Sequence, residues 1–172
     1  MSSGARPLKV WELLRALVAG GVEFLVIGGI AVAAHGFERA TKDLDVVPSP
    51  DPDNLERLYR VLSELDATPI EIGDFQPEEL PHPFSPEGLA AGGNWALMTE
   101  HGRIDVMQYV EGVFENDSDY AALADRGLVV ETPVGPVRFA GYEDLLRMKY
   151  AAGRDLDLID VRALREARGE LE

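Results

Sequence analysis

Apolar residues recur every three or four positions in several segments, which is the spacing that buries one face of an α-helix. The first such run follows Pro7 and stops at Gly20 and Gly21, which are typical of a helix end. Other runs predict helices over residues 51–65, 142–152 and 156–167, and shorter ones over 30–35 and 118–126. The pattern therefore predicts two successive helices after residue 141.

Short segments rich in β-branched and aromatic residues lie between these helices and predict strands. They cover residues 23–27, 43–47, 95–100, 103–109, 128–131 and 137–139. Turn residues separate the third strand from the fourth and the fifth from the sixth, so each of these pairs is expected to form a hairpin. The predicted class is α+β, with a small mixed β-sheet flanked by helices and a helical C-terminal segment.

Prolines and glycines interrupt the periodic pattern between residues 73 and 94, so we expect a long loop there. The chain has 172 residues, 46% of them hydrophobic, which suits one domain with its own core. We expect a core over residues 1–140, including this proline-rich acidic loop, and a helical segment over 141–172 packed on it. Cysteine is absent, which excludes disulfides, Cys-ligated metals and a thiol nucleophile.

The chain carries 31 acidic and 16 basic residues, a formal net charge of −15. More than half of this surplus lies within residues 61–102, which contain no Lys or Arg. Such a surface repels phosphate, which argues against broad binding to duplex nucleic acid. The first seven residues lack the apolar core of a signal peptide, and no apolar run reaches the roughly 18 residues that span a bilayer. We therefore expect a cytoplasmic protein without a membrane partner.

Acidic residues interrupt two of the predicted strands. Asp43 and Asp45 lie two positions apart, so their carboxylates point to one face while Leu44 points to the other. Adjacent carboxylates repel each other unless a divalent cation lies between them, and Asp oxygens are ligands that Mg²⁺ prefers. Asp105 interrupts a later strand in the same way. If the two strands are neighbours, three carboxylates converge, as in two-metal phosphoryl-transfer sites.

Gly28 and Gly29 stand between the first strand and a short predicted helix. Without side chains, the backbone at this point can approach a phosphate closely, and its free amides can donate hydrogen bonds to it. The pair adds a candidate phosphate-binding turn to the candidate metal site.

Taken together, these residues resemble the motifs of the nucleotidyltransferase superfamily related to DNA polymerase beta. That pattern is a Gly-Gly or Gly-Ser pair, an Asp-x-Asp strand and a third acid on a neighbouring strand. The resemblance implies that Asp43 and Asp45 bind two Mg²⁺ ions, or Mn²⁺ in their place. It also implies that Asp105 completes the metal site and helps to deprotonate the acceptor hydroxyl.

Two segments, 35–45 and 144–160, are similar to a narrower group: the AbiEii-like nucleotidyltransferases, known as toxins of type IV toxin-antitoxin systems, and their bacterial relatives. Within that resemblance, the residues expected to bind the nucleotide are Gly28, Gly29, Arg39, Thr41 and Lys149. Asp157 is expected to contact the nucleotide or the acceptor. The stretch from 73 to 94 lies outside the similar segments.

The implied reaction moves a nucleoside monophosphate from an NTP to a hydroxyl acceptor and releases pyrophosphate. The acceptor stays open between an RNA end, a protein and a small molecule, and a toxin would also have a cognate antitoxin as a partner. One alternative is an antibiotic-modifying nucleotidyltransferase of the lincosamide or aminoglycoside kind. Another is a non-catalytic binding module with the same fold.

Purely structural explanations compete with several of these roles. Asp105 could simply pair with Arg103. Lys149 stands near the end of a predicted helix, where a cation is favoured by the helix dipole. Asp157 and Asp160 could instead cap the last helix.

Overall fold

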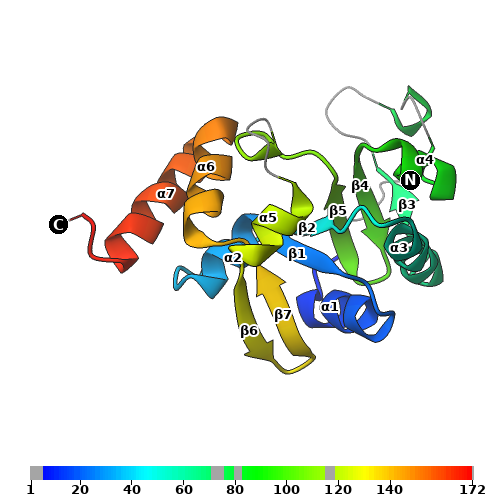
Figure 1. Ribbon diagram of the computed structural model, residues 1–172, viewed down its shortest axis with the longest axis horizontal. Coiled ribbons are helices and arrows are strands. Elements are labelled where there is room, and N and C mark those ends of the chain that lie inside the picture. Colours follow the sequence, from blue (N-terminus) through cyan, green and yellow to red (C-terminus); the bar gives the residue numbers. More distant parts are fainter. Residues whose placement is uncertain (1–5, 71–75, 80–82, 115–118, 172) are drawn as a thin grey trace.

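The computed structural model describes residues 6–70, 76–79, 83–114 and 119–171, which form a mixed β-sheet surrounded by helices (Figure 1). The strands are β1 (Phe24–Ile27), β2 (Asp43–Pro48), β3 (Thr68–Pro69), β4 (Asn94–Thr99), β5 (Gly102–Met107), β6 (Leu128–Thr132) and β7 (Gly135–Phe139). The helices are α1 (Val10–Ala19), α2 (Gly28–Ala34), α3 (Pro52–Glu64), α4 (Pro86–Ala91), α5 (Tyr120–Asp125), α6 (Tyr142–Ala152) and α7 (Asp155–Ala167), with a 3-10 turn at Pro77–Glu79. The predicted α+β class is confirmed.

The described strands form one sheet in the order β3-β4-β5-β2-β1-β7-β6. β2 runs parallel to β5 and β1 runs parallel to β7, whereas the other neighbouring strands are antiparallel. Both predicted hairpins are present, as β4–β5 and β6–β7. The parallel pairing of β2 with β5 fulfils the condition under which the three acids of the sequence motif converge.

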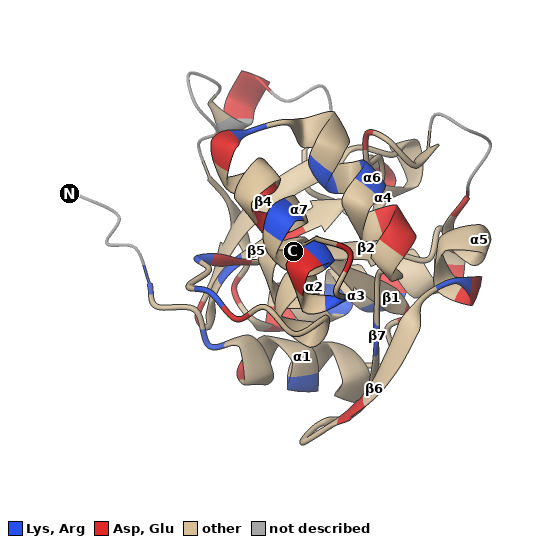
Figure 2. Cartoon of the chain, turned by 90° about the vertical axis from the view of Figure 1, so that its left-hand side faces the viewer, with Lys and Arg blue, Asp and Glu red and all other residues tan. Residues whose placement is uncertain are grey.

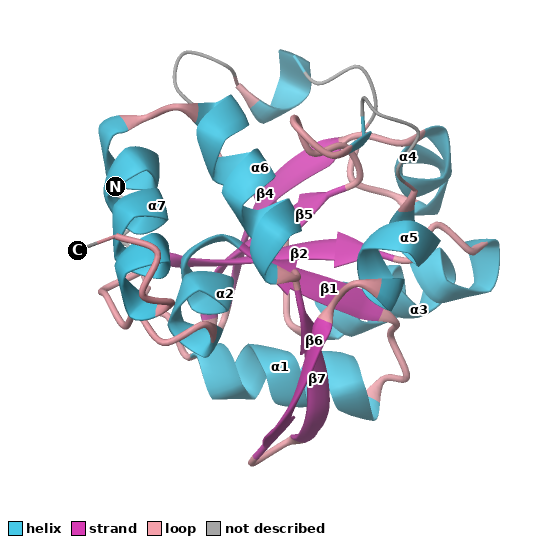
Figure 3. Cartoon of the chain, turned by 60° about the vertical axis from the view of Figure 1, so that its left-hand side comes forward, coloured by secondary structure: helices cyan, strands magenta, loops and turns pink. Residues whose placement is uncertain are grey.

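Alternation along β5 and the first half of β2 separates a core face from an open face. Leu44, Val46, Ile104 and Val106 are fully buried, while the residues between them are partly exposed. Because side chains alternate across a strand, all acids of the two strands lie on the face away from these apolar residues. The helix α6 passes over this part of the sheet, with α7 packed beside it (Figure 3).

The region from 73 to 94 is more regular than the sequence predicts. Within its described part, α4 spans Pro86–Ala91 and the 3-10 turn spans Pro77–Glu79, so the expectation of a continuous loop is wrong there. The residues taken as helix breakers are instead helix ends: Ser85 accepts a hydrogen bond from the Gly88 amide, Pro86 occupies the first turn, and Gly92 ends α4 at a φ of +86°. Residues 73–75 and 80–82 lie outside the described part.

Two smaller differences concern strand limits. β2 continues through Pro48, where the sequence predicts a stop, and β3 at Thr68–Pro69 has no counterpart in the prediction because two residues carry no readable period. Among the described residues, no helix combines the length and the apolar character that crossing a membrane requires.

Candidate active site

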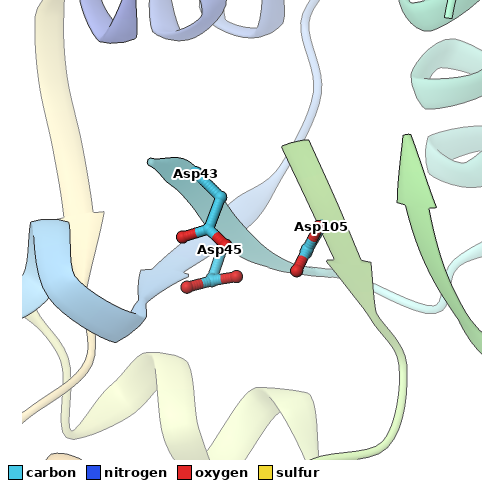
Figure 4. A group of neighbouring side chains, drawn as sticks. All are labelled: Asp43, Asp45 and Asp105. Carbon is cyan, nitrogen blue, oxygen red and sulfur yellow. The ribbon is translucent and has the colours of Figure 1, made fainter. Parts of the chain in front are cut away.

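Three aspartates from β2 and β5 converge on the open face of the sheet. In the parallel register, Asp45 stands opposite Asp105 and Asp43 stands opposite Arg103. One carboxylate oxygen from each of Asp43, Asp45 and Asp105 can be chosen so that all three lie within 4.8 Å of one another. Figure 4 shows the three side chains on their adjacent strands. We call this group the acidic triad.

Burial and the crowding of carboxylates together govern the electrostatics of the acidic triad. Burial, followed by the charges of Asp43 and Asp105, raises the pKa of Asp45 to about 7. Burial also raises the pKa of Asp105, although Arg103 opposes the shift. The triad is therefore short of positive charge in the protein alone.

Arg103 supplies part of that charge. Its Nε and Nη2 donate to the two oxygens of Asp105 at 2.7 and 2.8 Å, and its Nε lies 3.7 Å from Oδ2 of Asp43. The pairing of Asp105 with Arg103 that sequence analysis offered as a structural explanation is thus present. It coexists with the convergence of the triad, so the two interpretations do not exclude each other.

The acidic triad fits a divalent cation. It offers oxygen ligands from three carboxylates in one place, which is the donor set that Mg²⁺ and Mn²⁺ prefer. A cation there would relieve the repulsion that raises the pKa of Asp45. Asp43, Asp45 and Asp105 are the residues that would hold it.

Gly28 and Gly29 are the first two residues of α2, where the chain turns directly out of β1 beside the triad, and we call them the glycine turn. A Cβ on Gly28 would collide with Oδ2 of Asp45, and the φ of +68° at this position is one that other residues rarely adopt. A Cβ on Gly29 would stand 3.1 Å from Nη2 of Arg39 and 3.1 Å from Oγ1 of Thr41. Glycine at 28 is therefore needed to admit the Asp45 carboxylate, a structural reason that sequence analysis did not supply.

A second group of charged residues joins the C-terminal helices to the segment before β2. We call Arg39, Lys149, Arg154, Asp157 and Asp160 the charge cluster. Asp160 accepts two hydrogen bonds from Arg39 and pairs with Lys149. Asp157 accepts hydrogen bonds from Lys149 at 3.1 Å and from Nε of Arg154 at 2.7 Å. Three cations thus surround two carboxylates.

The carboxylates of the charge cluster are buried but stay ionised. Burial alone would raise the pKa of Asp157, yet the hydrogen bonds from Arg154 and Lys149 outweigh it and lower that pKa. The pKa of Asp160 is likewise lowered, because hydrogen bonds from Arg39 and Lys149 outweigh its burial. Asp157 also accepts a hydrogen bond from the Arg154 amide at 3.3 Å, so it caps α7 as the structural alternative predicted.

A cleft of about 750 Å³ lies between the sheet, α6 and the start of α7. All nine residues that the sequence assigns to the site line it: Gly28, Gly29, Arg39, Thr41, Asp43, Asp45, Asp105, Lys149 and Asp157. Its size suits a small-molecule or cofactor site. The cleft therefore brings residues from five separate parts of the sequence to one place.

The charge of the cleft differs from that of the whole chain. Its lining includes as many basic as acidic residues, namely Arg39, Lys42, Arg103, Lys149 and Arg154 against Asp43, Asp45, Asp105, Glu111 and Asp157. The chain as a whole has 31 acidic and 16 basic residues. Lys149 on α6 and Arg154, the N-cap residue of α7, contribute to this balance, and Figure 2 shows the basic positions on this side of the molecule. The cleft is thus less repulsive to an anion than the rest of the surface.

Sequence analysis left Asp160 outside the predicted site. This residue is fully buried and contacts two predicted site residues, Arg39 and Lys149. A helical spacing signal was available, because Asp160 follows Asp157 by three positions and shares its helix face. Its partner Arg39 lies 121 positions away in the sequence, and no local pattern indicates that contact.

Comparison with known proteins gives similarity at the level of structure. No protein-family model and no curated protein matches the chain. The structure of the lincosamide antibiotic adenylyltransferase LnuA with lincomycin bound has a TM-score of 0.63 and 14% sequence identity, over 94% of this chain and 99% of that one. The structure of ANT(2")-Ia in complex with adenylyl-2"-tobramycin has a TM-score of 0.56 and 15% identity, over 94% of this chain and 88% of that one.

The chain has a nucleotidyltransferase-like fold. The expectation of that fold, drawn from the Gly-Gly, Asp-x-Asp and third-acid motifs, is confirmed. The narrower similarity to AbiEii-like toxins stays a prediction. Within a nucleotidyltransferase-like fold, the acidic triad and the glycine turn occupy one cleft, which is the arrangement that the motifs imply.

Proposed function

We propose that this protein is a Mg²⁺-dependent nucleotidyltransferase that moves a nucleoside monophosphate from an NTP to a hydroxyl acceptor. The observation that carries the proposal is the acidic triad on a nucleotidyltransferase-like fold. Three neighbouring carboxylates are unfavourable in a folded protein unless a cation compensates them, and burial, followed by the charges of Asp43 and Asp105, raises the pKa of Asp45.

In the proposed reaction, the acceptor oxygen bonds to the α-phosphorus of the NTP. The bond from that phosphorus to the oxygen bridging to the β-phosphate breaks, and pyrophosphate leaves. Asp43 and Asp45 would hold Mg²⁺, two ions in the full arrangement, and the metal would supply positive charge near the phosphate oxygens. Asp105 completes the ligand set and accepts the hydroxyl proton, a role that suits a carboxylate whose pKa burial has raised.

We assign the triphosphate to the side of the cleft that holds the glycine turn. Gly28 and Gly29 lie there beside Arg39 and Thr41, and Lys149 faces the same cleft. Arg39 and Lys149 would stabilise the charge that develops on the phosphates during transfer. Asp157 also lines the cleft, and its proposed contact is with the nucleotide or the acceptor.

For the acceptor we propose a small hydroxyl-bearing molecule, in the manner of an antibiotic-modifying enzyme. LnuA was solved with lincomycin and ANT(2")-Ia with adenylyl-2"-tobramycin, and the similarity to LnuA covers 99% of that chain. The net charge of −15 further disfavours RNA as a tightly bound acceptor. An RNA or protein acceptor, together with a cognate antitoxin, is the competing toxin hypothesis.

The test uses each α-labelled NTP with Mg²⁺ and the purified protein. Lincomycin, tobramycin, total RNA and a protein extract are supplied as separate acceptors, and labelled products are separated by class. We expect label on a small molecule, and its loss in Asp45→Asn but not in the matched surface variant Glu131→Gln. Label on RNA or protein would favour the toxin hypothesis. Absence of NTP binding by calorimetry with Mg²⁺ would refute nucleotidyl transfer altogether and leave a non-catalytic module.

A further inference from the structure

Asp160 on α7 is a fully buried carboxylate that holds two cations of the cleft. Its oxygens accept hydrogen bonds from Nε and Nη2 of Arg39 at 2.7 and 2.9 Å. Oδ2 also lies 2.8 Å from Nζ of Lys149. Arg39 precedes β2 and Lys149 belongs to α6, so one acid connects two separate parts of the chain. Burial of a carboxylate is tolerated only with such compensation.

The contacts of Arg39 fix the plane of its guanidinium. Nε and Nη2 donate to Asp160, and Nη1 donates to the backbone oxygen of Ala40 at 3.1 Å. A guanidinium has five N–H groups, so donors remain available on Nη1 and Nη2. A methyl group on Gly29 would lie 3.2 Å from Nη1 and 3.1 Å from Nη2. The nitrogens that retain free donors are therefore the ones beside the glycine turn.

Lys149 is also held by buried carboxylates. Its ammonium lies 3.1 Å from Asp157 and 2.8 Å from Asp160, and it is close enough to the acidic triad to lower the pKa of Asp45. The charge cluster as a whole has three cations and two carboxylates. One unit of positive charge therefore remains for an anion in the cleft.

We infer that Asp160 is a positioning residue, which fixes Arg39 and Lys149 so that both cations face the polyphosphate of a bound nucleotide. This inference rests on the proposed function and deepens it. Asp160 itself is absent from the described lining of the cleft, so it acts through its two partners. Cations that are already held in place lose less side-chain freedom when the phosphates bind, which strengthens binding.

Calorimetry with Mg²⁺ tests the inference. The first probe is whichever of ATP, GTP, CTP and UTP the unmodified protein binds most tightly, and the second probe is the corresponding nucleoside. Asp160→Asn keeps the size of the side chain but removes the charge that holds Arg39 and Lys149. We expect about a 10- to 100-fold loss in triphosphate affinity, as for lost charge-assisted hydrogen bonds. Nucleoside affinity should change less than about twofold, because a nucleoside has no phosphate for these cations to contact. A merely structural role would lower both affinities alike.

Two further variants complete the experiment. Asp160→Glu keeps the charge but displaces it by one methylene, so we expect a several-fold loss of affinity for the triphosphate and none for the nucleoside. This variant tests the inference if Asp160→Asn does not fold. Glu166→Gln removes an exposed carboxylate from the same helix and should leave both affinities unchanged. Equal losses for triphosphate and nucleoside, or no loss for either, would overturn the inference while the proposed function stands. If the unmodified protein binds no NTP, both fail together.

Discussion

Two neighbouring groups of aspartates, the acidic triad and the charge cluster, differ in how many cations they contact. The acidic triad has three carboxylates and one close arginine, and the pKa values of Asp45 and Asp105 are raised. The charge cluster has two carboxylates and three cations, and the pKa values of Asp157 and Asp160 are lowered.

This difference separates two uses of buried charge. A group of carboxylates with few cationic neighbours suits the binding of a metal cation. A group of carboxylates already surrounded by cationic side chains instead connects parts of the fold. Burial raises the pKa of the carboxylates in both groups, but the hydrogen bonds from cations outweigh it only in the charge cluster.

Lys149→Met should cost about 3 kcal/mol in the free energy of unfolding, because it leaves Asp157 and Asp160 buried with one arginine each. Urea unfolding measures the change. Lys42→Met is the matched control, since Lys42 lines the same cleft but is exposed, and it should change stability by less than about 0.5 kcal/mol. Equal effects in the two variants would show that the charge cluster does not hold the fold together.

Mg²⁺ should stabilise the protein by about 2.7 kcal/mol when its concentration is one hundredfold above the Kd. A rise in Tm on titration with MgCl₂ measures this effect. The rise should disappear in Asp45→Asn and persist in Asp160→Asn, because only the acidic triad lacks cations. Persistence of the full rise in Asp45→Asn would place the cation elsewhere.

Asp45→Asn should stabilise the metal-free protein by about 2 kcal/mol, since it removes the carboxylate that burial and its neighbours penalise most. Urea unfolding at pH 8 in EDTA is the measurement, with Glu131→Gln as the surface control. Loss of stability in Asp45→Asn would contradict the claim that the triad is under-compensated.

The two groups should respond to pH in opposite directions. In EDTA, the unmodified protein should lose stability relative to Asp45→Asn as pH rises from the unfolded pKa near 3.8 to the folded value of about 7, by at most about 1.4 kcal/mol per pH unit. Above that range the difference should stay constant. Asp43, Asp105, Lys149 and Arg103 are the charges that set the folded value.

The lowered pKa values of Asp157 and Asp160 have the reverse consequence. Their contribution is present above about pH 4 and falls as acid protonates them, so acid unfolding should steepen below that pH. Stability curves from pH 2 to 9 measure both trends. A curve for Asp45→Asn parallel to that of the unmodified protein between pH 4 and 7 would refute the contrast.

Arg162→Ala should change the free energy of unfolding by less than about 0.5 kcal/mol. Its pair with Glu166 is 2.9 Å long but exposed on α7, the helix that carries Asp157 and Asp160. The comparison with Lys149→Met in the same urea experiment separates buried from exposed ion pairs. A loss of more than about 2 kcal/mol in the free energy of unfolding of Arg162→Ala would show that exposure does not determine how much an ion pair contributes to stability.

Local pattern was sufficient for most elements, and the motifs named candidate site residues that line one cleft. The alternation around Asp43 and Asp45 predicts a strand with two acids on one face, and β2 has that form. Helix α6 begins and ends at the predicted residues, because an apolar period and Gly153 with a left-handed φ of +62° define it locally. Helix α4 was missed because Pro86 and Gly92 mark helix ends as well as loops.

Contacts between distant parts of the chain set the limit of sequence reasoning. From the sequence, the convergence of Asp45 and Asp105 could be predicted only on the condition that their strands are neighbours. The structure fulfils this condition with a parallel register, and strand order depends on the packing of the whole sheet. The pair of Arg39 with Asp160 gave no signal at all. Two charged residues 121 positions apart have no local period that could indicate their contact.

The amino-acid sequence alone indicated which residues are candidates for binding a metal or a phosphate, because side-chain type and strand periodicity are local properties. Only the tertiary structure decided which charges stand beside which. The parallel pairing of β2 with β5 brings three carboxylates together with one arginine, and the packing of α7 places three cations around two other carboxylates. Because the energy of a buried charge depends on its neighbours within a few ångströms, aspartates of identical chemistry acquire opposite pKa shifts in one cleft.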